Sequence, residues 1–470
     1  MSKIKVNSIS SINDTNPVYF PTGVSGDGSN LSFQPTLISF DPASTSTGIS
    51  TTTNITLLFD QDVEFSGVGT IYIREGSVSG TIATSFTCGV STEATITGST
   101  LVIDPIDPLS FNQLYVISLP SIGIANTSGQ YYKGTQGYSF TTAQQALSAT
   151  GGTHEFTLAS APSPTGYYKY HVFTSTGPFV TTAPSFDADD LSSILVAGGG
   201  GGGSGGGGAG GVLKSTGPTL ALSAGTYTIT LGSGGATAPN NSTAGIDGGD
   251  STISTPTATL ITAYGGGGGG ALYAAATGGN PGGSGGGSNP APYNLFGTGV
   301  PGQGNPGGSG ATPSSWTQPG GGGGGAAAAG GTGNVTAPGT PSTYVGGTGG
   351  AGGTGATNPE FTTPILSGFV PTIPASSLSE IGSSGYFGGG GGGGAPAYPT
   401  GSVPRPVPAG GSGGGGNGSD NTIRTAENGY VNTGGGGGGG HIGPGVPGSP
   451  WPGGSGGSGV FMIRYAVTAP

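Results

Sequence analysis

The sequence predicts a mostly β protein with little or no α-helix: an extended N-terminal arm, a β-sandwich, and a β-framed glycine-rich domain of packed polyglycine II helices. Three observations predict it. Apolar and polar residues alternate after residue 34. Glycine supplies 109 of the 470 residues, most of them after residue 150. Only 6% of residues are charged. Because ordinary disorder is polar and charged, we expect the glycine-rich part to be packed.

The domain boundaries follow from apolar alternation and from glycine content. Residues 1–34 have little apolar periodicity and predict an arm, for which a frayed terminus and an arm that orders on another protein are both open interpretations. Residues 35–142 predict the sandwich, 143–153 a linker, and 154–470 the glycine-rich domain. The residues expected to face the sandwich core are Ile55, Leu57, Phe59, Ile71, Ile73, Leu101, Ile103, Tyr115, Ile117, Leu119, Tyr138 and Phe140.

The sandwich region also matches a known type of domain. The segments TGISTTTNITLLFDQDVEFSGVGTIYI and YYKGTQGYSFTT resemble a bacterial Ig-like domain of prokaryotic surface proteins. The resemblance implies a spacer or presentation module without catalysis. The single cysteine, Cys88, excludes an intramolecular disulfide, so packing and hydrogen bonds must stabilise the fold.

Seven glycine runs dominate the second part of the chain, and a nucleotide site is the first hypothesis to weigh. A dinucleotide fingerprint needs a helix behind the glycines and an acid about twenty residues later. Here more glycine follows, and no acid occurs before Asp247. A phosphate-binding loop fails because Leu213 precedes Lys214. The runs are Gly198–Gly203, Gly205–Gly208, Gly265–Gly270, Gly320–Gly325, Gly388–Gly394, Gly413–Gly416 and Gly434–Gly440.

A flexible tether is the second hypothesis, but linkers join domains, and here seven runs recur inside one region. Collagen is excluded because glycine does not recur at every third position. A packed array of extended threefold helices remains. Without Cβ atoms the backbones can approach closely, and hydrogen bonds of about 0.5–1.5 kcal/mol each can offset the backbone entropy that glycine loses. The runs are therefore predicted to lie side by side.

The order of segments in this part resembles the glycine-rich domain of phage tail and other virion proteins. It is carried by YHVFTSTGPFVTT, DDLSSILVAGGGGGG, AGTYTITLGSGG, ITAYGGGGGG and the terminal GGSGGSGVFMIRYAV, over residues 154–467. Such domains are similar to the polyglycine-helix sandwich of certain phage tail-tip adhesins. The opening MSKIKVNSIS…VYFPTGVSG resembles the N-terminal arms of structural proteins from marine cyanobacterial phages.

The connectors between runs are the candidate binding segments. A rigid array must release them at its edges, where aromatic side chains can meet a receptor. The alternative is that these aromatics pack on the faces of the array. The connectors are Asn289–Gln318, Ala395–Pro408 and His441–Pro452. The candidate receptor-loop residues are Tyr293, Phe296, Trp316, Tyr398, Arg405, His441 and Trp451.

The sequence contains no residue pattern that is typical of catalysis or of metal binding. His154, His171 and His441 are isolated, without zinc-ligand spacing. The acidic turns Phe59–Glu64 and Phe186–Asp190 lack a full set of calcium ligands. We therefore expect no enzyme activity, cofactor or metal, although an embedded glycan hydrolase stays open because two carboxylates suffice for that chemistry. Nine Lys and Arg residues against 20 Asp and Glu exclude nucleic acid as a partner.

The expected function is that of a structural phage protein, a tail fibre or tip adhesin that contacts a host glycan or outer-membrane protein. The arm would bind other virion proteins. A head or neck decoration protein without receptor binding is the alternative, and a cellular surface-layer protein is a third class. No apolar segment follows the lysines of MSKIKVNSIS, so we expect no signal peptide, synthesis in the host cytoplasm, and a place on the virion exterior. The oligomeric state, including a possible homotrimer, stays open because the sequence contains no heptad repeat that would indicate it.

Overall fold

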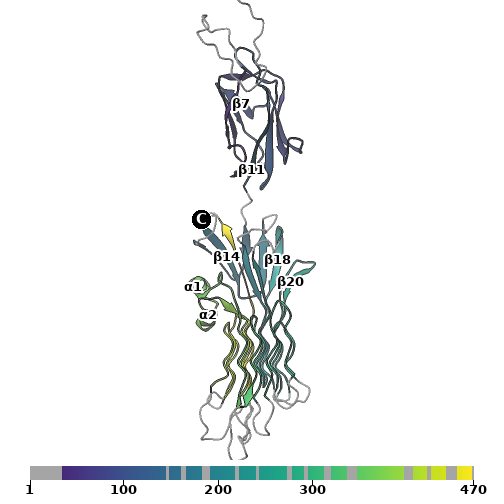
Figure 1. Ribbon diagram of the computed structural model, residues 1–470, viewed down its shortest axis with the longest axis vertical. Coiled ribbons are helices and arrows are strands. Elements are labelled where there is room, and N and C mark those ends of the chain that lie inside the picture. Colours follow the sequence, from purple (N-terminus) through teal and green to yellow (C-terminus); the bar gives the residue numbers. More distant parts are fainter. Residues whose placement is uncertain are drawn as a thin grey trace, which may run out of the picture. The chain divides into compact units, whose positions relative to one another are not determined.

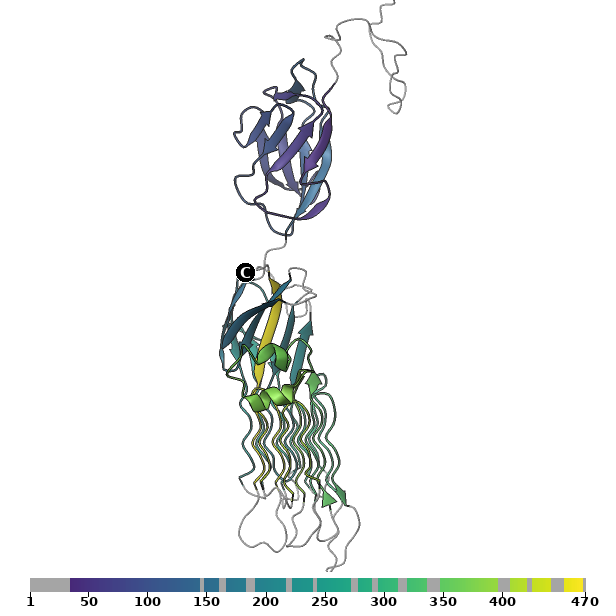
Figure 2. The ribbon, with the colours of Figure 1, turned by 90° about the vertical axis from the view of Figure 1, so that its left-hand side faces the viewer.

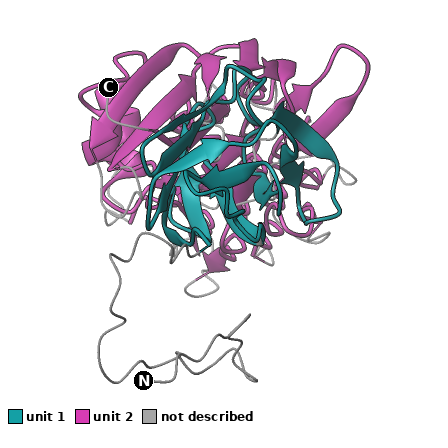
Figure 3. Cartoon of the chain, turned by 90° about the horizontal axis from the view of Figure 1, so that it is seen from above, with its two compact units in different colours: residues 1–145 teal, residues 146–470 magenta. Residues whose placement is uncertain are grey.

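The computed structural model describes residues 34–143, 148–159, 166–182, 191–216, 222–239, 243–271, 278–289, 295–311, 319–335, 347–395, 406–420, 425–440 and 452–467. The chain divides into two compact units, residues 1–145 and 146–470 (Figure 3). Of the expected arm, residues 1–34, only Gln34 belongs to the described part. Within the segment expected to be a linker, Ala149–Gly151 forms strand β12 of the second unit.

The first unit is a β-sandwich of two main sheets. One sheet has the order β1-β3-β8-β7, with strands Leu37–Asp41, Ile55–Phe59, Thr100–Ile103 and Ala94–Thr97. The other has the order β2-β11-β9-β5-β6, with strands Ser46–Ile49, Thr135–Thr142, Leu114–Leu119, Thr70–Glu75 and Ile82–Thr87. A short pair joins β4 (Val63–Phe65) to β10 (Ile124–Asn126). The pairing is antiparallel except between β2 and β11.

Apolar alternation placed the core of this sandwich correctly. All twelve residues predicted to face inward are buried, with at most 3% of their surface exposed. Strand β3 shows the reason, because its side chains alternate between buried and half-buried along the strand. Cys88 is buried beside them as a free thiol, and burial raises its pKa. The prediction of a packed sandwich is confirmed.

The second unit contains another pair of sheets. One has the order β12-β15-β18-β19-β20, with β15 Gly177–Thr181, β18 Gly225–Thr230, β19 Ser251–Ser254 and β20 Thr259–Ala263. The other has the order β13-β14-β25-β16-β17, with β13 His154–Ala159, β14 Tyr167–Phe173, β25 Val460–Val467, β16 Ser192–Val196 and β17 Val212–Thr216. The last strand, β25, therefore lies between β14 and β16 in the middle of its sheet. It thereby pairs the C-terminal part of the unit's sequence with its N-terminal part.

A helical insertion covers one of these sheets, and the sequence analysis did not foresee it. It lies between β23 (Ala356–Thr357) and β24 (Tyr386–Phe387) and contains α1 (Thr363–Leu366) and α2 (Ala375–Ile381) (Figure 2). Its apolar side chains share a core with β14 and β25. Phe369 of the insertion stacks on Phe156 of β13 at 4.7 Å between ring centroids. One further pair joins β21 (Asn334–Val335) to β22 (Gly347–Thr348).

The strands continue into glycine segments that run side by side away from the two sheets (Figures 1 and 2). Segment Ala197–Gly203 follows β16 directly. Its successive amides donate hydrogen bonds to three neighbouring segments in turn, and each segment accepts again three residues later. The acceptors are Gly211, Gly208 and Gly205 on the first segment, Gly249 and Ile246 on the second, and Gly457 and Gly454 on the third. Its carbonyls accept from three others, on segments 235–238, 266–269 and 437–440. Partners that repeat every three residues on six sides define a polyglycine II array, as predicted.

Close packing, and not turn formation, explains the glycines inside this array. A Cβ atom built on Gly200 would lie 2.3 Å from the carbonyl oxygen of Gly267, and one on Gly202 would lie 2.0 Å from that of Gly438. Real Cβ atoms essentially never approach other atoms within 3.0 Å. Both obstacles are backbone atoms, which cannot swing aside as a flexible side chain can. Any side chain at these positions would push neighbouring helices apart.

Sequence pattern distinguishes helices inside the array from helices at its border. The seven glycine runs are buried throughout. At the border, by contrast, a residue other than glycine occurs at every third position, as at Thr348, Ala351 and Thr354, and the last two are exposed. Between them Gly350 and Gly353 are buried. A threefold helix presents one position in three outward, so glycine is needed only at the other two.

Candidate functional site

The glycine helices end together in one hydrogen-bonded layer, on the side of the unit opposite its two sheets (Figure 1). Gly394 donates to the carbonyl of Ser204 at 2.9 Å, Gly440 to Gly203 at 2.7 Å, and Ser204 to Gly270 at 2.7 Å. We call this set the terminal layer. Its members are Gly203, Ser204, Gly205, Gly270, Gly287, Ser288, Gly320, Gly394, Ser419 and Gly440.

The chain enters or leaves the array at this layer. The described segments there stop at Ala271, Asn289, Ala395, Asp420 and Gly440 or begin at Pro319, each within two residues of a terminal-layer member. Six of the seven candidate receptor-loop residues fall in the intervals that adjoin those ends. Tyr293, Trp316, Tyr398, Arg405, His441 and Trp451 therefore lie outside the described residues. Their assignment stays a prediction, but the array brings the adjoining chain ends to one face.

Phe296 is the one candidate that the structure describes. Its side chain is 43% exposed, next to Leu295, which is 48% exposed. The carbonyl of Leu295 accepts from Gly279 at 2.7 Å, and Gly297 donates to Gly286 at 2.8 Å. These bonds hold both flanks of Phe296 against the array. The backbone that carries this exposed aromatic side chain is thereby held beside the terminal layer.

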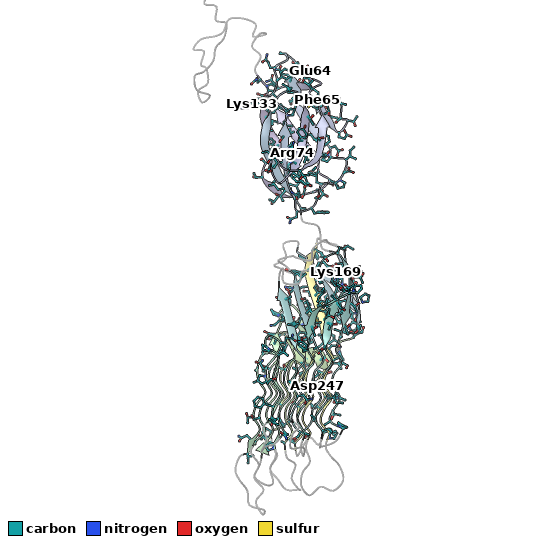
Figure 4. The ribbon with its side chains drawn as sticks, turned by 90° about the vertical axis from the view of Figure 1, so that its right-hand side faces the viewer. Glu64, Phe65, Arg74, Lys133, Lys169 and Asp247 are labelled. Carbon is teal, nitrogen blue, oxygen red and sulfur yellow. The ribbon has the colours of Figure 1, made fainter. Side chains whose placement is uncertain are left out.

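Where the array meets solvent, polar side chains accept hydrogen bonds from the glycine amides. The carboxylates of Asp247 and Asp250 accept the amides of Gly268 and Gly265, each at 2.8 Å (Figure 4). The two acids are three residues apart, as are the two glycines, so one turn of each helix separates the bonds. Asp247 also accepts from the side-chain amide of Asn280 at 2.8 Å. The carboxylates thus replace a missing neighbouring carbonyl.

A buried histidine, for which the sequence indicated only that it lacks zinc-ligand spacing, joins the two sheets of the second unit. Nδ1 of His171 donates to the carbonyl oxygen of Gly151 at 2.7 Å, because a carbonyl can only accept. Nε2 lies 3.1 Å from the hydroxyl of Tyr465, which accepts from the amide of Ala149 at 3.0 Å. His171 itself has no exposed surface. The network fastens β12 to the opposite sheet.

Charged groups complete this network. Glu155 accepts from the amide of Gly151 at 2.6 Å and pairs with Lys169 at 3.0 Å. Burial opposes its ionisation, but these two bonds and the charges of His171 and Lys169 outweigh burial and lower its pKa below 4.5. Burial lowers the pKa of His171 below 6.5, although the bond to Gly151 and the nearby Glu155 act in the other direction. The buried imidazole is therefore harder to protonate than an exposed one.

Among the described residues, no group of three or more His, Cys, Asp or Glu side chains is placed to hold a metal ion. Within one predicted acidic turn, Asp60 accepts from the amide and hydroxyl of Thr36 at 2.9 and 2.7 Å, and these bonds lower its pKa. The other turn, Phe186–Asp190, lies outside the described residues. Neither helix of the described chain has the length and apolar character that a membrane span requires.

Comparison with known proteins agrees with this architecture. Residues 174–466 match the family model of a glycine-rich domain, and residues 32–142 match that of a bacterial Ig-like domain. A search of curated proteins and of solved structures found no significant match. Since the first of the two matches covers more than half of the chain, the protein belongs to the glycine-rich domain family and carries a bacterial Ig-like domain before it.

Proposed function

We propose that this chain is a structural protein of a bacteriophage particle, a tail fibre or tip protein that attaches to the host surface. The contact would be made by the segments that adjoin the terminal layer. The observation that supports this proposal most directly is the common end of the glycine helices. Loops carry binding residues best when a rigid scaffold positions them, and helices bonded on six sides form such a scaffold.

The adjoining sequence has the composition of a binding surface. Tyr293, Phe296, Trp316, Tyr398 and Trp451 are aromatic, and Arg405 and His441 add polar recognition. Tyr, Trp and Arg are the residue types that most often dominate binding energy at interfaces. Aromatic side chains with few charges suit a glycan or an outer-membrane protein of the host, and the proposal involves no catalytic step and no nucleic acid. Residues 1–34 would attach the chain to other virion proteins.

Replacement of both tryptophans tests the binding role. Particles that carry Trp316→Ala together with Trp451→Ala should adsorb to host cells at least about tenfold more slowly, since each aromatic anchor contributes 2 kcal/mol or so. Tyr264→Ala is the matched control, because Tyr264 is 46% exposed but follows β20 at the sheet end of the array. Normal adsorption by a correctly folded double variant would contradict the proposal.

Immunogold labelling of intact particles tests the location. Label at the end of the tail would support a fibre or tip protein. Label over the head would instead favour a decoration protein without receptor binding, and absence of label from purified particles would exclude a virion protein of either kind. Antibodies should be raised against the Ig-like domain, residues 35–142, so that they do not compete for the proposed binding segments.

A further inference from the structure

A groove on the Ig-like domain has features of a binding site, although that domain was expected to act only as a spacer. The groove has a volume of about 510 Å³ and lies where β5, β9 and β11 meet the loop that precedes β11. Its volume falls within the range of about 300–1,000 Å³ that small-molecule sites occupy. The residues that line it are Thr70, Tyr72, Ser118, Leu119, Pro120, Ser121, Ile122, Lys133, Gly134 and Thr135.

One cationic side chain lines the groove of an otherwise acidic domain. Arg74 and Lys133 are the only cationic residues among residues 34–143, which contain eight Asp and Glu residues (Figure 4). Lys133 is exposed and lines the groove, and no acidic side chain does. Arg74 stands two residues after Tyr72 on the same outward face of β5. The groove therefore favours a ligand that carries negative charge.

The aromatic wall of the groove is held in place before any ligand arrives. The guanidinium of Arg74 lies 4.7 Å from the centroid of the Tyr72 ring, within range of a cation–π interaction. Arg74 is itself fixed by a hydrogen bond of 3.0 Å from Nη1 to the carbonyl oxygen of Gly80. A ring that is already oriented loses less entropy when a ligand packs against it.

The remaining lining selects the class of ligand. Thr70, Ser118, Ser121 and Thr135 supply hydroxyl groups, which both donate and accept hydrogen bonds. A peptide cannot add as an extra strand here, because β5 lies between β9 and β6, and β9 lies between β11 and β5. We propose that this groove binds an acidic saccharide, with the sugar ring against Tyr72 and its carboxylate paired with Lys133.

Titration of the full chain with a disaccharide tests this proposal. The probes are α-1,4-linked digalacturonate and its neutral counterpart, α-1,4-linked digalactose, and binding is followed by saturation-transfer NMR. We expect digalacturonate to bind with a Kd on the order of 1 mM and the neutral sugar more weakly. Lys133→Gln should weaken only digalacturonate, by up to about fivefold, the value of an exposed ion pair. Tyr72→Ala should weaken both sugars.

Two further variants sharpen the outcome. Phe111→Ala removes an aromatic residue of the same domain that is 45% exposed but lies outside the groove, so it should leave both affinities unchanged. Arg74→Lys keeps the charge but loses the planar stacking on Tyr72, and it should weaken both sugars less than Tyr72→Ala does. Equal binding of the two sugars, or unchanged binding by the double variant of Tyr72→Ala and Lys133→Gln, would overturn the proposal.

Discussion

The amide of Gly437 donates a hydrogen bond of 2.9 Å to the carbonyl oxygen of Gly200. These residues belong to helices at opposite ends of the glycine-rich sequence, and they meet because the array is assembled from segments far apart in the chain. The bond joins segment Ala197–Gly203 to one of the six neighbouring segments that surround it. The stability of the unit should therefore depend on backbone spacing more than on side-chain burial.

Gly200→Ala should destabilise the second unit by about 3 kcal/mol, the cost of overpacking a site that cannot relax. The new methyl group would meet the carbonyl of Gly267, which accepts from Gly208, while the amide of Gly267 donates to Ser284. Gly177→Ala is the matched control, since a Cβ atom there meets nothing within 4 Å, and it should change stability by less than about 1 kcal/mol. Thermal unfolding of both variants checks the prediction. Equal effects would show that close backbone approach is not what requires glycine.

Amide exchange should be slow throughout Gly265–Gly270 and Gly434–Gly440, because these residues are buried and their amides are bonded to other helices or to capping side chains. Hydrogen–deuterium exchange measured by mass spectrometry provides the test. Peptides from the exposed turn around Ser77–Gly80 of the Ig-like domain serve as the rapidly exchanging reference. Exchange of the glycine runs at the rate of that turn would contradict the packed array.

Asp247→Ala should lower the stability of the second unit by about 1 kcal/mol, since the amides of Gly268 and Asn280 lose their shared acceptor. Asp247→Asn keeps the accepting oxygen and should be nearly neutral. Denaturant titration of the two variants separates the contribution of the accepting oxygen from that of the charge. If the asparagine variant were as unstable as the alanine variant, the charge, and not the acceptor, would be responsible.

The second unit should lose stability as the pH falls below 6.5. The pKa of His171 is lowered in the folded state, so the unfolded chain binds a proton in a pH range where the folded chain does not. The stabilisation is complete above 6.5 and declines as the pH falls towards the lowered value. The pKa of Glu155 is also lowered, which adds a second loss below 4.5. Thermal unfolding at pH 7.5 and 5.5 measures the effect.

The Ig-like domain is an internal control for this pH dependence. The histidines of the chain are His154, His171 and His441, so residues 35–142 contain none. Its unfolding temperature should change little between pH 7.5 and 5.5, while that of the second unit falls. In His171→Gln the fall over this range should be smaller, since a glutamine side chain does not titrate. A drop of equal size in that variant would assign the effect to another group.

Local patterns were enough to predict much of the fold. Alternation at Ile55, Leu57 and Phe59 identified a core face because side chains on a strand alternate whatever the partner strand is. The glycine runs predicted polyglycine helices because seven of them recur within one region, where the nucleotide-site, tether and collagen hypotheses fail. The period of three at Ala351 and Thr354 was an additional signal that could have identified a border helix. The candidate receptor residues, Phe296 apart, remain predictions from composition.

By itself, then, the sequence determined which residues face the core of the first sandwich and the helical form of the glycine runs. Tertiary structure alone decided which glycine helices are neighbours, that the helical insertion covers a sheet, and that His171 is buried against Tyr465. The physical reason is that a glycine helix bonds through its backbone, which is identical at every position. Nothing in such a run specifies its neighbours, so the order of the array depends on residues outside the runs, such as strands β16 and β20, which lead into two of them.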